Sequence, residues 1–204
     1  MTQTHMEELH MKTDDSNVLA QAVHDLGAAL WFGGSVMGAA GVNKSGHELR
    51  DDLDKIRVAG SAWQRFAPAQ WGGIAAVLLA GARLTQESKS RLALQHGWGR
   101  AGGIKAAVAV VGAGATAYAA YSGQKVGQLA EQAQQSGQLH VEDANTPEAD
   151  TPTELATWQK RNRMAQYAVP LLSGANIVLN AYLVQTYRPG AAARGLARRV
   201  LPIG

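Results

Sequence analysis

Residues Leu26–Asn43 read LGAALWFGGSVMGAAGVN, and this stretch of 18 residues contains no Asp, Glu, Lys or Arg. Three further stretches, of 17, 19 and 24 residues, are equally free of charge: Phe66–Ala82, Ala106–Gln124 and Met164–Tyr187. Helices of soluble domains carry charged residues on their outer face. A bilayer has a hydrocarbon core of about 30 Å, which roughly 20 mostly apolar residues can cross. The four stretches therefore predict an all-α fold, a four-helix transmembrane bundle.

The composition of the whole chain is less apolar than this fold would suggest. Its mean hydropathy is −0.15, because the residues outside the four stretches carry all of the charge. The stretches themselves are rich in Ala and Gly, and Ala crosses a bilayer with little gain or cost, so hydropathy understates them. The alternative is a soluble, Ala/Gly-rich helical bundle whose core helices carry no charge.

Turn and cap signals divide the chain into a bundle and two tails. Ser45-Gly46-His47-Glu48 and Thr151-Pro152-Thr153-Glu154 both match the capping-box pattern that starts a helix. These helices overrun the membrane on the side of the long loops. We expect a polar N-terminal tail (1–17), a membrane bundle (18–188) and a basic C-terminal tail (189–204). The expected spans are 18–41, 64–84, 104–123 and 164–187, and the expected helical parts beyond the membrane are 46–63, 124–139 and 152–163.

The charge distribution gives an orientation and excludes one class of partner. Lys and Arg divide almost equally between the two sides of the expected membrane, and most of those on the long-loop side are balanced by acids. We therefore expect a multi-pass protein of the cell or inner membrane, with the N-in/C-in orientation favoured. The C-terminal tail contains no acid, which favours contact with anionic lipid headgroups. Basic residues are not interleaved with aromatic ones, so nucleic acid is not an expected partner. The basic residues of the tail are Arg188, Arg194, Arg198 and Arg199.

A pair of ionisable residues, His24 and Asp25, lies near the start of the first span. Burying charge in a membrane is costly, so such a pair is a candidate functional site. The simpler alternative is that both groups are solvated at headgroup depth. In that case Asp25 pairs with a base from the same side of the membrane, Arg83, Arg100 or Lys105.

Two amides in the last span, Asn176 and Asn180, are four residues apart and share one helix face. An amide in lipid needs a hydrogen-bond partner, which Ser35, Thr116 or Tyr118 could supply. The pair is interpreted either as a polar contact between helices or as part of a polar binding site.

Small residues at helical spacing predict close helix packing. Gly34 and Gly38 form a small-xxx-small motif in the first span, and Gly112 and Gly114 give the third span a second smooth face. A tight bundle is the preferred interpretation, and a homodimer seam is the alternative.

The sequence offers little catalytic chemistry. The absence of cysteine excludes disulfides, thiolate catalysis and Cys-based metal sites. No nucleotide-binding or hydrolase motif is found, so no catalytic residue, metal or cofactor is expected. Haem b between helices is an alternative, and it would need His24 with His96 as the second axial ligand.

The first span contains the pattern His24-x-x-Gly27-x-x-x-Trp31-Phe32-Gly33-Gly34. This pattern resembles the opening of the copper-resistance D family and of a four-span membrane family of unknown function that includes a human transmembrane protein linked to cisplatin resistance. The layout of the second family is also similar, with a short second loop and a long polar third loop before a basic approach, Trp158–Arg163. The resemblance implies a four-helix membrane bundle and no established reaction. The chain lacks the second intramembrane His that a copper or haem role would require.

The function expected from these patterns is that of a non-enzymatic integral membrane protein, an accessory, scaffold or stress-related component. Its partners would be the lipid bilayer and either another membrane protein or further copies of itself. Two alternatives stay open. One is a haem- or metal-binding redox protein using His24, and the other is an oligomeric small-solute transporter using Asp25, Asn176 and Asn180.

Overall fold

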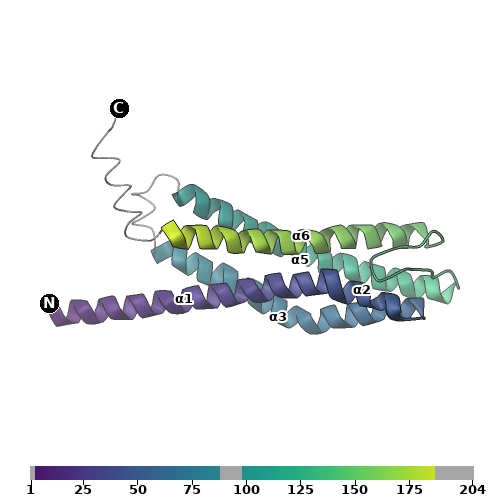
Figure 1. Ribbon diagram of the computed structural model, residues 1–204, viewed down its shortest axis with the longest axis horizontal. Helices are drawn as coiled ribbons and strands as arrows, with labels where there is room; N and C mark the ends of the chain where they lie inside the picture. The colour runs from purple at the N-terminus through teal and green to yellow at the C-terminus, as the bar shows by residue number, and fades with distance from the viewer. Residues whose placement is uncertain (1–2, 88–97, 187–204) are drawn as a thin grey trace, which may run out of the picture.

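Four long helices run antiparallel to one another along the whole molecule (Figure 1). They are α1 (Gln3–Met37), α3 (Asp52–Glu87), α5 (Trp98–Gln135) and α6 (Thr153–Thr186). The computed structural model describes residues 3–87 and 98–186, and this part of the chain contains no strand. The predicted all-α class is therefore confirmed. α1 packs chiefly on α3 and α5 chiefly on α6, with looser contacts closing the ring between α1 and α6 and between α3 and α5.

The connection between α1 and α3 is itself helical. A π-helical turn (Gly38–Val42) leads into the short helix α2 (Asn43–Ser45) and a 3₁₀ turn (Gly46–Glu48). A π turn contains an extra residue per turn and so changes which side of the helix the next residues face. Asn43, the first residue beyond it, is 2% exposed and lies in the bundle interior.

The first predicted helix start is displaced along the chain. The helical part expected from residue 46 begins at Asp52, because the cap is Asp51 rather than Ser45. The Asp51 carboxylate accepts a hydrogen bond from the Asp54 backbone N–H at 3.0 Å, as an N-cap does. Ser45 instead donates its hydroxyl hydrogen bond to the Gly41 carbonyl at 3.0 Å.

The other helices begin close to their expected first residue or earlier in the chain. The polar tail expected over 1–17 is helical from Gln3, and α5 begins at Trp98 rather than near Ile104. α6 begins at Thr153, next to the expected start at Pro152. The Thr151 hydroxyl bonds within the preceding loop, where it accepts from the Glu148 N–H and donates to the His140 carbonyl.

The C-terminus of α5 is closed by a glycine cap. Gly137 has φ of +67°, a left-handed conformation that L-residues with a side chain avoid. The Gln138 N–H donates to the Ala133 carbonyl, and the Gly137 N–H donates to the Gln134 carbonyl. This pair of bonds is the Schellman motif, which ends a helix and turns the chain sharply. The loop 138–152 then folds back over the end of the bundle.

Two apolar clusters form the core, one in each half of the bundle. The cluster beside the loop includes Leu53, Ile56, Val126, Ala130 and Leu155. The second cluster lies in the other half of the bundle, towards the end where α1 starts and α6 ends. Its buried members are Ala28, Trp31, Ile74, Val77, Ala109 and Val169.

Two stretches of described helix are long and apolar enough to cross a membrane, Arg100–Gln135 and Thr153–Gln185. Each contains an 18-residue window with a mean hydropathy of 1.4. Few residues in these windows are buried inside the bundle, with 17% in the first and 28% in the second, so most of their apolar surface faces outward.

Candidate functional site

Helices α1 and α3 approach each other closely at Gly27. A Cβ atom on Gly27 would lie 2.7 Å from the Gly73 carbonyl oxygen and 2.7 Å from the Ala76 Cβ. A Cβ on Gly73 would in turn lie 2.8 Å from the Gly27 carbonyl oxygen. The two backbones are therefore in contact, and this contact fixes the depth at which the neighbouring His24 meets α3.

The four glycines expected to mediate packing occupy different surroundings. A Cβ on Gly34 would lie 1.9 Å from the Phe66 ring, and one on Gly38 would lie 2.2 Å from the Trp63 ring. Gly112 accommodates the Trp31 ring in the same way. Gly114 differs from the expectation, because it is exposed and a Cβ there would meet no atom within 4 Å.

The predicted polar residues of the first and last spans meet at the end of the bundle where α6 ends. Asn180 donates to the Asp25 carboxylate at 2.8 Å and accepts from Lys105 Nζ at 2.6 Å. Gln21 also donates to both carboxylate oxygens of Asp25, at 2.9 Å each. We call Asp25, Asn180 and Lys105 the amide-bridged ion pair. It joins α1, α5 and α6.

His24 and Asn176 lie beside this pair with unused polar atoms. His24 is fully buried, with Nδ1 at 3.0 Å from the Asp25 carboxylate and Nε2 without a hydrogen-bond partner in the described chain. A Cβ on Gly81 would be 4.0 Å from Nε2. Asn176 donates to the Lys105 carbonyl at 3.5 Å, and its Oδ1 has no partner among the described residues. His24 and Asn176 are thus buried, whereas the Asp25 side chain beside them is 54% exposed.

The partners expected for the two amides bond elsewhere. Lys105 was one of three bases expected near Asp25, and it reaches the carboxylate through Asn180. Thr116 accepts from the Trp31 indole N–H at 3.2 Å, and Ser35 accepts from the Gln70 amide at 3.1 Å. These bonds lie deeper in the bundle than Asn176 and Asn180.

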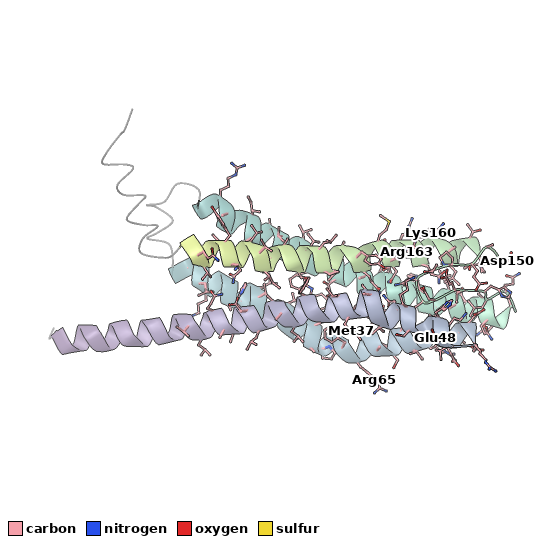
Figure 2. All side chains as sticks on the ribbon, viewed as in Figure 1. Met37, Glu48, Arg65, Asp150, Lys160 and Arg163 are labelled. Carbon is pink, nitrogen blue, oxygen red and sulfur yellow. The ribbon has the colours of Figure 1, made fainter. Side chains whose placement is uncertain are left out.

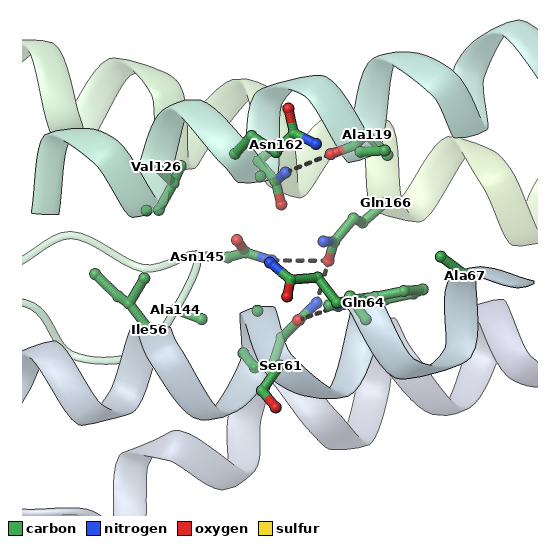
Figure 3. A pocket seen from close by; sticks show the side chains of 18 of the residues that line it. Ile56, Ser61, Gln64, Ala67, Ala119, Val126, Ala144, Asn145, Asn162 and Gln166 are labelled. Atoms are coloured by element: carbon green, nitrogen blue, oxygen red, sulfur yellow. Dashed lines mark hydrogen bonds between the residues drawn. The ribbon is translucent and has the colours of Figure 1, made fainter.

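A cavity of about 580 Å³ lies between α3 and α5, towards the loop end (Figure 3). A ring of amides lines one side of it, and we call the whole space the amide cavity. Gln166 accepts from both the Asn43 and the Asn145 side chains, the second at 2.8 Å, and Asn43 accepts from the Trp63 indole at 2.8 Å. Most of the remaining wall surface is apolar, but polar side chains also line it. The apolar residues include Ile56, Ala59, Ala67, Trp71, Ala119, Ala120, Val126 and Val169, and the polar ones include Ser35, Ser61, Gln64, Gln70, Thr116, Gln124 and Gln128.

The amide ring has hydrogen-bonding capacity left over. Asn162 is 1% exposed, and it donates to the Ala119 carbonyl and the Ser122 hydroxyl at 2.9 Å each. Its Oδ1 has no partner in the described chain and lies on the side towards Gln166 (Figure 3). Gln166 Nε2 and Asn145 Oδ1 likewise bond to no described group. The ring can therefore both donate to and accept from a further molecule.

An ion pair outside the apolar part of the bundle positions Asn145. Lys44 Nζ lies 2.7 Å from the Asp143 carboxylate, which also accepts from the Asn145 N–H at 2.7 Å. Burial alone would raise the pKa of Asp143, but hydrogen bonds from Lys44, Asn145 and Thr146 outweigh it and lower that pKa. The same ion pair raises the pKa of Lys44.

The Lys44–Asp143 pair makes the stability of the loop depend on pH. The pKa of Asp143 is lower in the folded protein than its ordinary value of 3.8, so its stabilising effect is complete above that value and is lost as pH falls below it. We expect the thermal midpoint to drop below about pH 4 and Asp143→Asn to flatten that drop while costing about 1–3 kcal/mol at neutral pH. Thermal unfolding between pH 2.5 and 7 measures both, with Asp150→Asn, at an exposed position, as the control. Identical pH profiles for Asp143→Asn and the wild type would contradict this assignment.

Sequence reasoning missed most of the amide ring, although α6 carried a signal for it. Six polar residues of α6 recur at steps of three, four, seven, three and four, and all are 8% exposed or less. A repeat that averages 3.5 residues places side chains on one inward-facing seam. The six residues are Gln159, Asn162, Gln166, Ser173, Asn176 and Asn180.

Several sequence expectations fall outside the described residues. His96, which the haem alternative needs, is one of them, as are the tail residues Arg188, Arg194, Arg198 and Arg199. A haem at His24 would also need open space at Nε2, where the side chain is fully buried. Comparison of the chain with models of protein families, with curated proteins and with solved structures gave no match.

Proposed function

We propose that the chain is a four-span integral membrane protein with a binding or scaffolding role rather than a catalytic one. The observation that carries the proposal is an apolar belt around the charge-free stretches of all four long helices. Large apolar side chains in this belt point outward, where a soluble protein would place charge. The belt consists of Leu26, Leu30, Phe32, Val36, Met37, Trp71, Leu79, Val110, Val111, Tyr118, Tyr121, Met164, Tyr167, Leu171, Val178, Tyr182 and Val184.

The interior enclosed by the belt is polar at several levels, which also supports a lipid surrounding. His24, Ser35, Thr116, Ser173 and Asn176 are each at most 3% exposed. Membrane bundles use such polar contacts between helices because lipid gives apolar side chains no reason to prefer the interior. A soluble bundle would have the opposite distribution.

The charged residues that limit the belt lie one bilayer apart. Asp25 and Lys44 on α1 and its continuation, and Lys105 and Lys125 on α5, are about 28–30 Å apart along the helix at 1.5 Å per residue. A hydrocarbon core is about 30 Å thick. Arg65 and Arg163 lie on opposite sides of the bundle, in its half towards the loop end (Figure 2). We call the level of Lys44, Arg65, Lys125 and Arg163 the loop-side border.

The proposed topology places both described ends of the bundle on one face of the membrane. The start of α1 and the end of α6 lie at the same end of the molecule (Figure 1). N-in/C-in is the orientation we propose from the distribution of Lys and Arg. Contact of the C-terminal tail with anionic lipid and association with a membrane partner or further copies remain parts of this proposal.

Labelling of single cysteines tests the four spans, and the natural absence of cysteine makes every label unambiguous. Ala149→Cys and Gln86→Cys lie at exposed positions at opposite ends of the bundle. In oriented membranes a membrane-impermeant maleimide is expected to label Ala149→Cys from outside and Gln86→Cys only after permeabilisation. Leu171→Cys, at a position 74% exposed in the bundle, is expected to stay unlabelled on both sides because lipid covers it.

Two outcomes would remove the proposal. One is rapid labelling of Leu171→Cys in intact membranes. The other is release of the wild-type protein into the supernatant by alkaline carbonate, which extracts peripheral but not spanning proteins. Leu171→Cys labelled after solubilisation in detergent is the control that the thiol itself can react.

A further inference from the structure

We infer that the amide cavity binds a neutral single-chain lipid whose headgroup carries hydroxyl groups, in the manner of a monoacylglycerol. The inference rests on the membrane placement proposed above, because that placement puts the cavity at the loop-side border. It goes beyond that proposal in naming a site and a ligand class.

The size and the position of the cavity match such a ligand. Its volume of about 580 Å³ lies within the roughly 300–1,000 Å³ of small-molecule sites. On the membrane side it is lined by Ala67 and Trp71 of α3 and by Ala119 and Ala120 of α5, together with the polar residues Gln70 and Thr116. These residues belong to two charge-free stretches, so an acyl chain entering between α3 and α5 would meet an uncharged and mostly apolar wall.

The hydrogen-bonding groups define the headgroup. The unpartnered Oδ1 of Asn162 is buried, and a buried acceptor without a partner is destabilising, so a ligand that donates to it gains binding energy. Gln166 Nε2 offers a donor in the same ring. A hydroxyl group both donates and accepts, whereas an ester only accepts. The ring therefore selects a hydroxylated headgroup over an ester of the same chain.

The charges around the cavity exclude an ionised headgroup from the amide ring. Arg57 and Glu131 are the charged residues in the lining, and they pair with each other at 3.6 Å across α3 and α5. Both are more than half exposed, at the outer end beyond the membrane. The amide ring itself has no countercharge, and burying an unpaired carboxylate or phosphate there would be costly.

Tryptophan quenching tests the site, since Trp63 and Trp71 line the cavity. The protein is placed in phosphatidylcholine nanodiscs, and a monoacylglycerol brominated at mid-chain is titrated in. We expect a saturable quenching phase above the linear one from surrounding lipid. Unlabelled monoacylglycerol should displace it, and the methyl ester of the same chain should need at least a tenfold higher concentration. Linear quenching alone, or equal displacement by the ester, would overturn the assignment.

Matched glycine variants separate the cavity from the lipid-facing surface. Gly127→Leu on α5 and Gly60→Leu on α3 fill the cavity from positions where a Cβ meets nothing within 4 Å. Both are expected to abolish the saturable phase. Gly114→Leu, equally unobstructed but on the outer surface of α5, is expected to keep it. Saturable quenching that survives both cavity variants would contradict the site.

The membrane placement and the lipid site can fail separately in this design. If alkaline carbonate releases the protein, the same titration is run in solution without nanodiscs. Saturable quenching there would support the lipid site and contradict the spanning topology. A protein that stays in the membrane and shows only linear quenching would support the topology and contradict the site.

Discussion

Gly27→Val is expected to lower the free energy of unfolding by about 3 kcal/mol, the upper end of the range for overpacking. The new side chain would meet the Gly73 carbonyl oxygen, which would lie only 2.7 Å from the Cβ. A backbone atom cannot rotate away as a side chain can, so α1 and α3 must move apart. This separation would also displace His24, one turn earlier on α1.

The effect is measured by unfolding of the purified protein in mixed micelles with increasing dodecyl sulfate. Gly33→Val is the matched control on the same helix, because a Cβ on Gly33 meets no atom within 4 Å. We expect the control to change stability by less than about 1 kcal/mol. Equal losses for the two variants would show that β-branching in α1, rather than contact with α3, causes the effect.

Gly34→Ala should be partly rescued by Phe66→Leu, since there the obstacle is a ring.

Asn180→Leu is expected to cost about 2–3 kcal/mol, because it removes two hydrogen bonds to charged groups at once. The Asp25 carboxylate and the Lys105 ammonium would each lose the amide that joins them. Leucine can bond to neither group. Asp25 keeps the hydrogen bonds from Gln21, but these lie within α1, so the contact between α1, α5 and α6 weakens.

The same unfolding experiment distinguishes a specific bridge from general loss of an amide. Asn176→Leu changes the same residue type one turn earlier, where the amide makes a single bond of 3.5 Å and leaves its oxygen unpartnered in the described chain. We expect this control to be neutral or stabilising. In the Asn180→Leu background, Asp25→Asn and Lys105→Met should become additive, whereas in the wild type they should be coupled by about 1 kcal/mol. Coupling that persists without Asn180 would mean that the two charges interact directly.

The charge pattern predicted the fold class, because it depends on which residues a helix can expose. Asp25, Arg83, Lys105 and Arg163 lie at the borders of uncharged stretches that are long enough to form helices. The proposed number of membrane spans is less strongly encoded. Ala and Gly contribute little hydropathy, so only two of the described helical stretches are apolar enough to be candidate spans. For α1 and α3 the proposal rests on the apolar side chains that they expose.

The candidate residues of the first and last spans were predictable because each is expensive to place in lipid. His24, Asp25, Asn176 and Asn180 do lie together, with Lys105 added by the antiparallel arrangement of α5. Their bonding pattern was not predictable, because it depends on the depth at which the helices cross, and the Gly27 contact sets that depth. The sequence motif at Gly34 and Gly38 gave no indication of it.

The helix start expected at Ser45 was wrong for a local reason. Ser45 and Asp51 are both good caps, and the sequence pattern alone favours the one followed by Glu48 three residues later. The π turn before Asn43 keeps the chain helical through Ser45, so its hydroxyl bonds backwards to Gly41. A capping box is active only where the preceding helix has ended, and no sequence pattern here marks a π turn.

In the proposed membrane placement, the position of the amide cavity decides which lipids could reach it. The cavity lies near the loop-side border and extends only part of the way towards the level of Asp25. Lipids cross between the two leaflets of a bilayer far less readily than they diffuse within one. A molecule entering between α3 and α5 would therefore come from a single leaflet, and the occupancy of the cavity would report the composition of that leaflet alone.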